Sequence, residues 1–146
     1  MPEVNYIAVV VAALVPGIMG AIYYGPLLEK QWLSSMEKTK EEMVPNNMPV
    51  SYGLALVMAL IISLFMKFVM ELVHKDVSDA GELIFASHHT FGHGAFHGIL
   101  LCLSFAVPVI VSLGLFQKNS AKNILLNVAF WLICFALMGG ILDVWN

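Results

Sequence analysis

The sequence predicts an all-α fold: an integral membrane four-helix bundle with a short interfacial helix after the first span. Hydrophobic residues make up 60% of the 146-residue chain and charged residues only 12%, and the mean hydropathy is +0.84. A soluble domain of this length could not bury so much apolar surface. A helix needs about 20 predominantly apolar residues to cross a bilayer. Four stretches meet that requirement, at residues 4–24, 51–73, 91–116 and 123–145.

The four spans leave room for short loops alone, so residues 1–146 are predicted to form a single transmembrane domain in a lipid bilayer. The first span is expected to remain in the protein, because no Lys or Arg precedes it and no small-residue cleavage pattern follows it. Cys102 and Cys134 fall inside spans, where we expect free thiols. The net charge of -3, without a basic patch, indicates no nucleic-acid partner.

The first loop carries apolar residues at near-helical spacing, with charged residues between them: Trp32, Leu33, Met36, Met43 and Val44. This pattern predicts a short helix lying in the membrane interface. The prolines at positions 45 and 49 are expected to end that helix and to turn the chain back into the membrane.

The lysines predict the orientation of the bundle. Five of the seven basic residues lie in or beside the first and third loops: Lys30, Lys38, Lys40, Lys118 and Lys122. The second loop has Lys75 alone. Because cytoplasmic loops carry the excess of positive charge, both termini and the second loop are predicted to lie outside, across a bacterial inner membrane.

Small residues recur along the spans: Ala13, Gly17 and Ala21 in the first, Gly94 and Gly98 in the third, and Gly139 and Gly140 in the fourth. Such rows let helix backbones approach closely in a bilayer. The rows fit packing within one chain and packing between chains equally well, so a homo-oligomer remains an open alternative.

Four of the five histidines cluster where the third span begins, at His88, His89, His93 and His97. On a helix the last three form one stripe, but its ends are about 12 Å apart, too far to hold one ion. Two of them could bind a metal with ligands from elsewhere. Residues of the second loop could complete the shell: His74, Asp76, Asp79 and Glu82. Imidazole with carboxylate favours zinc or iron, and a haem fits the sequence less well.

Two other interpretations of the histidines stay open. They could be polar residues in the headgroup region, or they could relay protons. Lys67 and Glu71, four residues apart near the end of the second span, are relay candidates together with His97. Alternatively, Lys67 and Glu71 are a pair that reaches for the outer interface. His97 discriminates between these interpretations, because it lies about one turn inside the apolar region, where polar groups tend to face the interior of a bundle and to be functional.

No nucleophile elbow, phosphate-binding glycine-rich loop or His-Glu-x-x-His motif is present in the sequence. We therefore expect no enzymatic activity and assign no catalytic residue.

Several segments carry a family resemblance: Asn5 before the first span, "YYGP" at its end, "HGAFHG" at the start of the third span, and "NVAFWLICFALMGGILDVW" at the end of the chain. With these segments the chain resembles an uncharacterised bacterial family of small four-span membrane proteins, a domain-of-unknown-function family, and most closely a Bacteroidetes-like branch of it. The resemblance implies the four-span fold. It also implies that His93, Gly94, His97 and Gly98 belong to a recurring block, and it implies no activity.

Three classes of function follow from the sequence. The first is a structural or accessory subunit of a larger membrane complex, or a homo-oligomer, whose mark would be a lipid-facing His97. The second is a small ion or proton transporter or channel formed by oligomerisation. The third is a metal- or haem-binding membrane protein that uses the histidines between His88 and His97.

Overall fold

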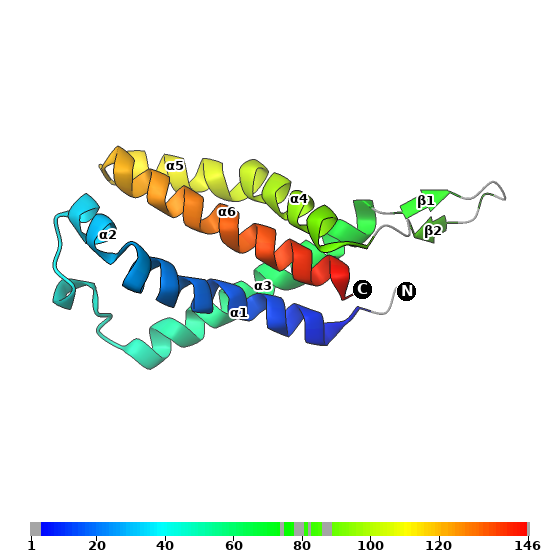
Figure 1. The fold of residues 1–146 in the computed structure, drawn as a ribbon, viewed down its shortest axis with the longest axis horizontal. Coiled ribbons are helices and arrows are strands. Elements are labelled where there is room, and N and C mark those ends of the chain that lie inside the picture. The colour runs from blue at the N-terminus through cyan, green and yellow to red at the C-terminus, as the bar shows by residue number, and fades with distance from the viewer. Residues whose placement is uncertain (1–3, 74, 78–80, 82, 86–88, 146) are drawn as a thin grey trace.

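The computed structural model describes residues 4–73, 75–77, 81, 83–85 and 89–145. Within this part of the chain, four helical segments are long and apolar enough to cross a membrane: Tyr6–Leu27, Met48–Leu72, Phe91–Phe116 and Ala121–Val144. They lie side by side along the long axis of the molecule (Figure 1). The predicted four-helix membrane bundle is therefore confirmed, and each predicted span agrees with an observed one to within a few residues.

The first span consists of α1 (Tyr6–Ile22) and a π-helical turn over Tyr23–Leu27. Asn5 caps it, since its Oδ1 accepts hydrogen bonds from the backbone N–H groups of Ile7 and Ala8. The amide of Asn5 also donates to the carbonyl oxygen of Trp145 at 2.9 Å, which ties the two ends of the described chain together. The helical backbone is interrupted at Gly25, directly before Pro26, because the residue before a proline disfavours the helical conformation.

The first loop differs from the prediction. Helix α2 (Glu29–Met36) ends at Met36, where Glu37 adopts a left-handed conformation with φ of 54°. Met43 and Val44 therefore lie beyond the helix, and a 3-10 turn covers Glu41–Met43. A left-handed residue ends a helix because it redirects the chain, and the apolar spacing alone did not show this stop.

Helix α2 is held against the bundle by its serines. Ser120 Oγ donates to the carbonyl oxygen of Ser35 at 2.7 Å, and Asn123 Nδ2 donates to Ser35 Oγ at 3.1 Å. Ser35 is itself buried. These bonds connect the first loop to the start of the last helix, so α2 is a docked element of the bundle.

Two polar contacts order the charged part of the first loop. Lys40 forms an ion pair with Glu29 at 2.6 Å, and the hydrogen bond from Lys40 to this carboxylate raises the pKa of Lys40. The backbone N–H of Thr39 donates to Glu42 at 2.7 Å and lowers the pKa of that carboxyl. Both groups stay charged near neutral pH.

The second span is α3 (Met48–Val73). Pro49 lies in its first turn and begins a helix, in contrast to the expected helix end. A proline is tolerated there, because the first turn has no carbonyl partner for its missing N–H. After α3 come two short antiparallel strands, β1 (Lys75–Val77) and β2 (Leu83–Phe85), with Asp76 opposite Ile84. This hairpin projects beyond the helices (Figure 1), so it leaves the helical architecture of the bundle unchanged.

The third span is α4 (Phe91–Leu101), a π-helical turn over Cys102–Ala106, and α5 (Val107–Phe116). The π-helical turn comes just before Pro108, where an α-helix would bring the proline ring against the carbonyl of Ser104. The last span is α6 (Ala121–Val144), capped by Ser120 through a bond from Asn123 N–H. A loop of a few residues makes α5 and α6 antiparallel.

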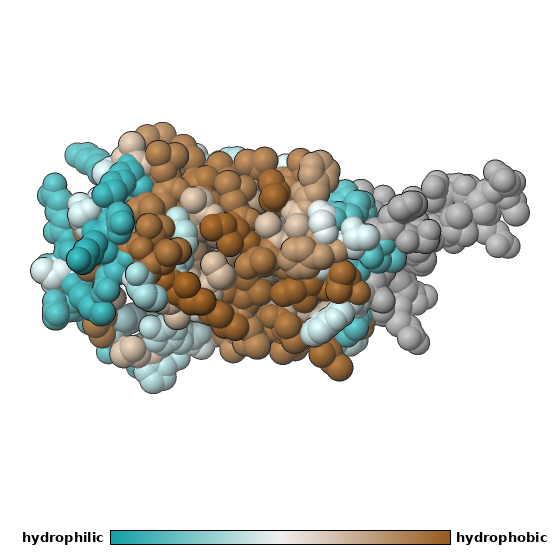
Figure 2. Space-filling view, in the orientation of Figure 1, coloured by the Kyte–Doolittle hydropathy of each residue, from teal (hydrophilic) through white to brown (hydrophobic). Residues whose placement is uncertain are grey.

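Helix α6 is the centre of the bundle and contacts α1, α3 and α4. The core residues include Met138, Leu142, Cys102 and Cys134, which are fully buried. Apolar side chains cover the outside between two polar ends (Figure 2). Such a band is what a hydrocarbon environment requires, so the chain is an integral membrane protein.

Candidate functional site

The candidate site lies between α4 and α6, where two glycines on α4 bring the helix backbones into contact. A Cβ atom added at Gly94 would collide with the carbonyl oxygen of Gly139 and with Cβ of Asp143. A Cβ added at Gly98 would come within 2.8 Å of the carbonyl carbon of Phe135. Only glycine permits such an approach. The histidines beside these glycines are thereby placed next to α6.

Asp143 is the centre of the site. Its Oδ1 accepts from Nδ1 of His89 at 3.2 Å, and its Oδ2 accepts from Nδ1 of His93 at 3.1 Å. The backbone N–H of Thr90 donates to Oδ2 at 3.2 Å. Asp143 is only 3% exposed, in the last turn of α6. A buried carboxylate needs such partners, because an isolated one is strongly disfavoured away from water.

His93 and His97 continue the chain of polar contacts away from Asp143. Their Nε2 atoms are 3.2 Å apart, and their ring centroids are 4.6 Å apart. An ionised carboxylate only accepts hydrogen bonds, so Nδ1 of His93 carries a proton. In neutral His93 the Nε2 atom is then an acceptor, and Nε2–H of His97 donates to it. The three side chains thus form a directed chain from a buried acid toward the middle of the membrane.

His97 is the residue that discriminates between the sequence-based interpretations. It is half-buried, and its ring packs between His93 and Phe96, with ring centroids 5.8 Å apart in the second contact. A histidine that only faced lipid would not need a polar partner such as His93. The geometry therefore brings His89, His93 and His97 into one hydrogen-bonded group around Asp143.

Lys67 and Glu71 form a second polar group next to the first. The Lys67 Nζ lies 3.2 Å from Glu71 Oε1, and the two side chains are 3% and 8% exposed. The expectation that this pair reaches for the outer interface is therefore wrong, because the packing of α3 against α6 buries it. Lys67 also donates to the carbonyl oxygen of Leu142 at 3.3 Å. Both polar groups thus meet α6 at adjacent residues, Leu142 and Asp143.

The structure describes only part of the metal-ligand set that was expected from the second loop. His74, Asp79, Glu82 and His88 lie outside the described residues, and of Asp76 the structure gives the backbone in β1. Among the described residues, no group of three or more His, Cys, Asp or Glu side chains could hold a metal ion.

The sequence suggests Asp143 as a hydrogen-bond partner between helices or at the interface, and places the acids near the histidines in the second loop. In the structure Asp143 is the acidic partner of His89 and His93. One signal in the sequence pointed to this contact: the end of the fourth span and the start of the third lie on the same predicted side of the membrane.

Beyond His97 the core becomes apolar. Cys102, Cys134 and Met138 are each fully buried, and both cysteines are free, as predicted. At the opposite end of the bundle, Tyr24 donates to Asn127 at 2.6 Å, and Asn127 donates to Asn123 at 3.1 Å. This second polar ladder connects the first loop to α6 and contains no charged group. Among the described residues, the buried charged side chains Lys67, Glu71 and Asp143 thus lie at the end that faces the second loop.

Comparison with known proteins gives a family match over most of the chain. Residues 7–143 match the family described as "Protein of unknown function (DUF1761)". No curated protein and no solved structure matches the chain. The match covers nearly the full length, including the glycines, the histidines and Asp143, so the chain belongs to the DUF1761 family and is a small membrane protein of unknown activity.

Proposed function

We propose that this protein handles protons in the membrane, as a small transporter or channel subunit built around Asp143, His93 and His97. The supporting observation is the chain of two hydrogen bonds, at 3.1 Å and 3.2 Å, that joins these three side chains. Ionisable groups inside membrane spans are costly and are commonly part of ion or proton pathways. Histidine suits this role because it changes its charge near neutral pH.

The proton moves along the chain by donation between ring nitrogens. A proton that binds Nδ1 of His97 makes this ring cationic, and its Nε2 proton then passes to Nε2 of His93. His97 becomes neutral again, and His93 becomes an imidazolium ion whose charge Asp143 compensates. The reverse sequence delivers a proton toward the middle of the bilayer. The positive charge on His93 is thus formed next to the negative charge of Asp143.

The relay of one chain is shorter than the membrane. His97 lies about 9 Å along α4 from its first residue, at 1.5 Å per residue, whereas the hydrocarbon core is about 30 Å thick. We therefore propose that the working unit is an oligomer of this chain, or a complex with another membrane protein. Lys67 and Glu71 supply a further pair of charges next to the relay.

Proton flux into vesicles tests the proposal. Purified protein is reconstituted in liposomes that contain a pH-sensitive dye, and a potassium gradient with valinomycin provides the driving force. We expect flux above that of empty vesicles, and we expect H97Q to reduce it to the empty-vesicle level. The control is Gly92→Ala on the same helix, where a Cβ meets no atom within 4 Å. Flux that is equal in H97Q and in the unchanged protein, or absent from both, contradicts the proposal.

A second candidate function, metal binding, is favoured by one distance. The Nε2 atoms of His93 and His97 are 3.2 Å apart. Two bonds of about 2.0–2.1 Å at a near-tetrahedral angle place two ligand nitrogens about 3.2–3.4 Å apart. Asp143 would then orient His93 through Nδ1, as carboxylates do for ligating histidines. Zinc or iron suits this donor set, with further ligands from the second loop as predicted from the sequence.

Elemental analysis separates the two candidates. Protein purified without a His tag is compared with the double variant H93A/H97A. Stoichiometric zinc or iron that disappears in the double variant supports the metal site. Metal-free protein that still conducts protons supports the relay.

We further propose that the chain lies in a bacterial inner membrane with both termini and the second loop outside. A cysteine introduced at Ser78 is then expected to react with an impermeant thiol reagent from outside, whereas one at Gln31 in α2 is not. Cys102 and Cys134 give a low background because both are fully buried. The opposite labelling pattern overturns the orientation.

A further inference from the structure

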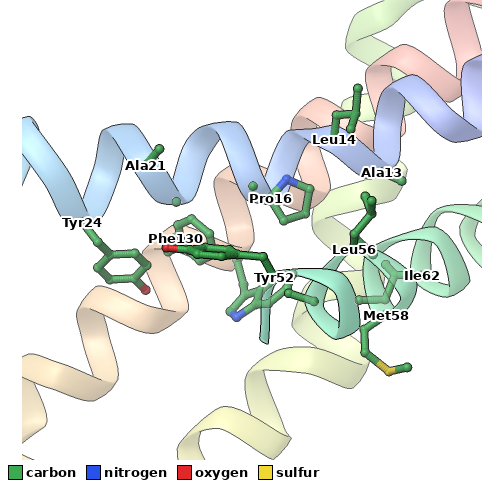
Figure 3. A pocket seen from close by; sticks show the side chains of 15 residues that line it. Ala13, Leu14, Pro16, Ala21, Tyr24, Tyr52, Leu56, Met58, Ile62 and Phe130 are labelled. Carbon is green, nitrogen blue, oxygen red and sulfur yellow. The ribbon is translucent and has the colours of Figure 1, made fainter. Parts of the chain in front are cut away.

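A cavity of about 600 Å³ lies between α1, α3 and α6. Figure 3 shows Ala13, Pro16 and Ala21 of α1 on one side of it, and Tyr52, Leu56 and Ile62 of α3 on the other. Its lining is almost entirely apolar, and it does not include the histidines or Asp143. It is therefore separate from the proposed relay.

Small side chains leave this space open. A Cβ atom added at Gly17 would meet no other atom within 4 Å, and one added at Gly20 would meet only Phe130, at 3.9 Å. Ala55 and Ala59 contribute little volume from α3. The cavity is thus a gap between helices that no side chain of the described chain fills.

The cavity occupies one leaflet of the membrane. On α1 it extends from Ala13 to Tyr24, about 16 Å at 1.5 Å per residue. On α3 it extends from Ile62, near the middle of the span, to Tyr52, near its start. Half of a hydrocarbon core is about 15 Å thick. The cavity therefore runs from the membrane centre to the interface on the side of the first loop.

The length and lining of the cavity indicate its occupant. An extended hydrocarbon chain suits an apolar space that runs from the interface to the middle of the bilayer. A helix of a second copy packed over the opening is the alternative occupant.

The chemistry at the interface end suits a lipid headgroup. Tyr24 and Tyr52 lie at the level where aromatic residues usually meet headgroups. At the same end, the ammonium groups of Lys30 and Lys38 are exposed and form no ion pair with a described residue. Cationic side chains at the membrane surface attract anionic lipids. We propose that the cavity binds one acyl chain of an anionic phospholipid, with its phosphate near the lysines of the first loop.

Fluorescence quenching tests this site, because Trp131 lines the cavity. Trp32 and Trp145 are first replaced by Phe, so that Trp131 is the remaining tryptophan. The protein in mild detergent is titrated with phosphatidylglycerol that carries bromine on its acyl chains. We expect saturable quenching, and we expect Gly17→Phe, which fills the cavity, to abolish the saturable part. The matched control is Gly53→Phe on α3, where an added Cβ also meets nothing within 4 Å, but outside the cavity lining.

The other outcomes are distinct. Quenching that rises without saturation, or that Gly17→Phe and Gly53→Phe change equally, overturns the site. Equal affinity for brominated phosphatidylcholine overturns the role of the anionic headgroup. If Trp131 resists quenching, and Gly17→Phe converts a dimer into a monomer in light scattering, a second copy covers the cavity and the lipid proposal is wrong.

Discussion

The α4–α6 interface and the cavity between α1 and α3 both carry rows of small residues, yet they are packed in opposite ways. At the first, Gly94 and Gly98 contact the backbone of α6. At the second, Gly17 faces open space. The helices approach where polar groups connect them: Asp143 binds α4 from α6, and Ser63 of α3 donates to the carbonyl oxygen of Val9 in α1 at 2.8 Å. The cavity begins beyond this last bond. Small residues thus permit close packing but do not cause it.

The largest loss of stability is expected when Lys67 is replaced, because Lys67 holds α3 against α6 beyond the end of the cavity. Lys67→Met leaves the buried carboxylate of Glu71 without its ion-pair partner, and breaking a buried pair costs about 3–5 kcal/mol. The free energy of unfolding in mixed micelles measures this. The double variant K67M/E71L is expected to recover most of the loss, because no buried charge remains. A double variant as unstable as K67M alone would show that the pair acts through something other than charge.

A smaller loss is expected when the α4–α6 interface is forced apart. Gly98→Ala places a methyl group against the backbone of Phe135, and overpacking of this kind costs about 3 kcal/mol at its upper end. The same unfolding measurement applies. Gly92→Ala is the control, since it lies on the same helix and faces open space. Equal stability of G98A and G92A would contradict the close contact between α4 and α6 at Gly98.

Removing the charge of Asp143 is expected to destabilise the α4–α6 interface by less than Gly98→Ala does. Asp143→Asn keeps the shape and one acceptor oxygen but loses charge-assisted bonds to His89 and His93, at a cost of about 1.5 kcal/mol. The imidazole nitrogen signals in NMR should also change for His93. Unchanged signals and stability would exclude Asp143 as the centre of the site.

The smallest change in stability, a gain and not a loss, is expected from a substitution in the cavity. Gly17→Ala meets no atom within 4 Å and replaces the poorest helix former except proline, so it should stabilise the protein by about 0.5–1 kcal/mol. Comparison with G98A makes this the sharpest test of the contrast, because the chemical change is identical. A destabilisation by G17A as large as that by G98A would contradict the open packing around Gly17.

The spans, their antiparallel order and the free thiols could be predicted from the sequence, because each depends on local composition and on short connections. The stop of α2 at Glu37 and the place of Pro49 inside α3 could not. They depend on single backbone conformations, which apolar spacing does not encode. The hairpin after α3 was missed because two strands of three residues leave no periodic signal.

For the candidate site, the sequence by itself determined which titratable residues enter the membrane: Lys67, Glu71, the histidines of the third span and Asp143. Only the tertiary structure decided which of them meet. The contact between His93 and Asp143 joins residues 50 positions apart, and the two glycines of α4 permit it because they leave room for α6. The burial of Lys67 and the opening of the cavity likewise depend on how far α3 diverges from its neighbours. The composition of each segment decides whether that segment enters the lipid. Contact between two helices depends on the surfaces of both helices, which no single segment of the sequence specifies.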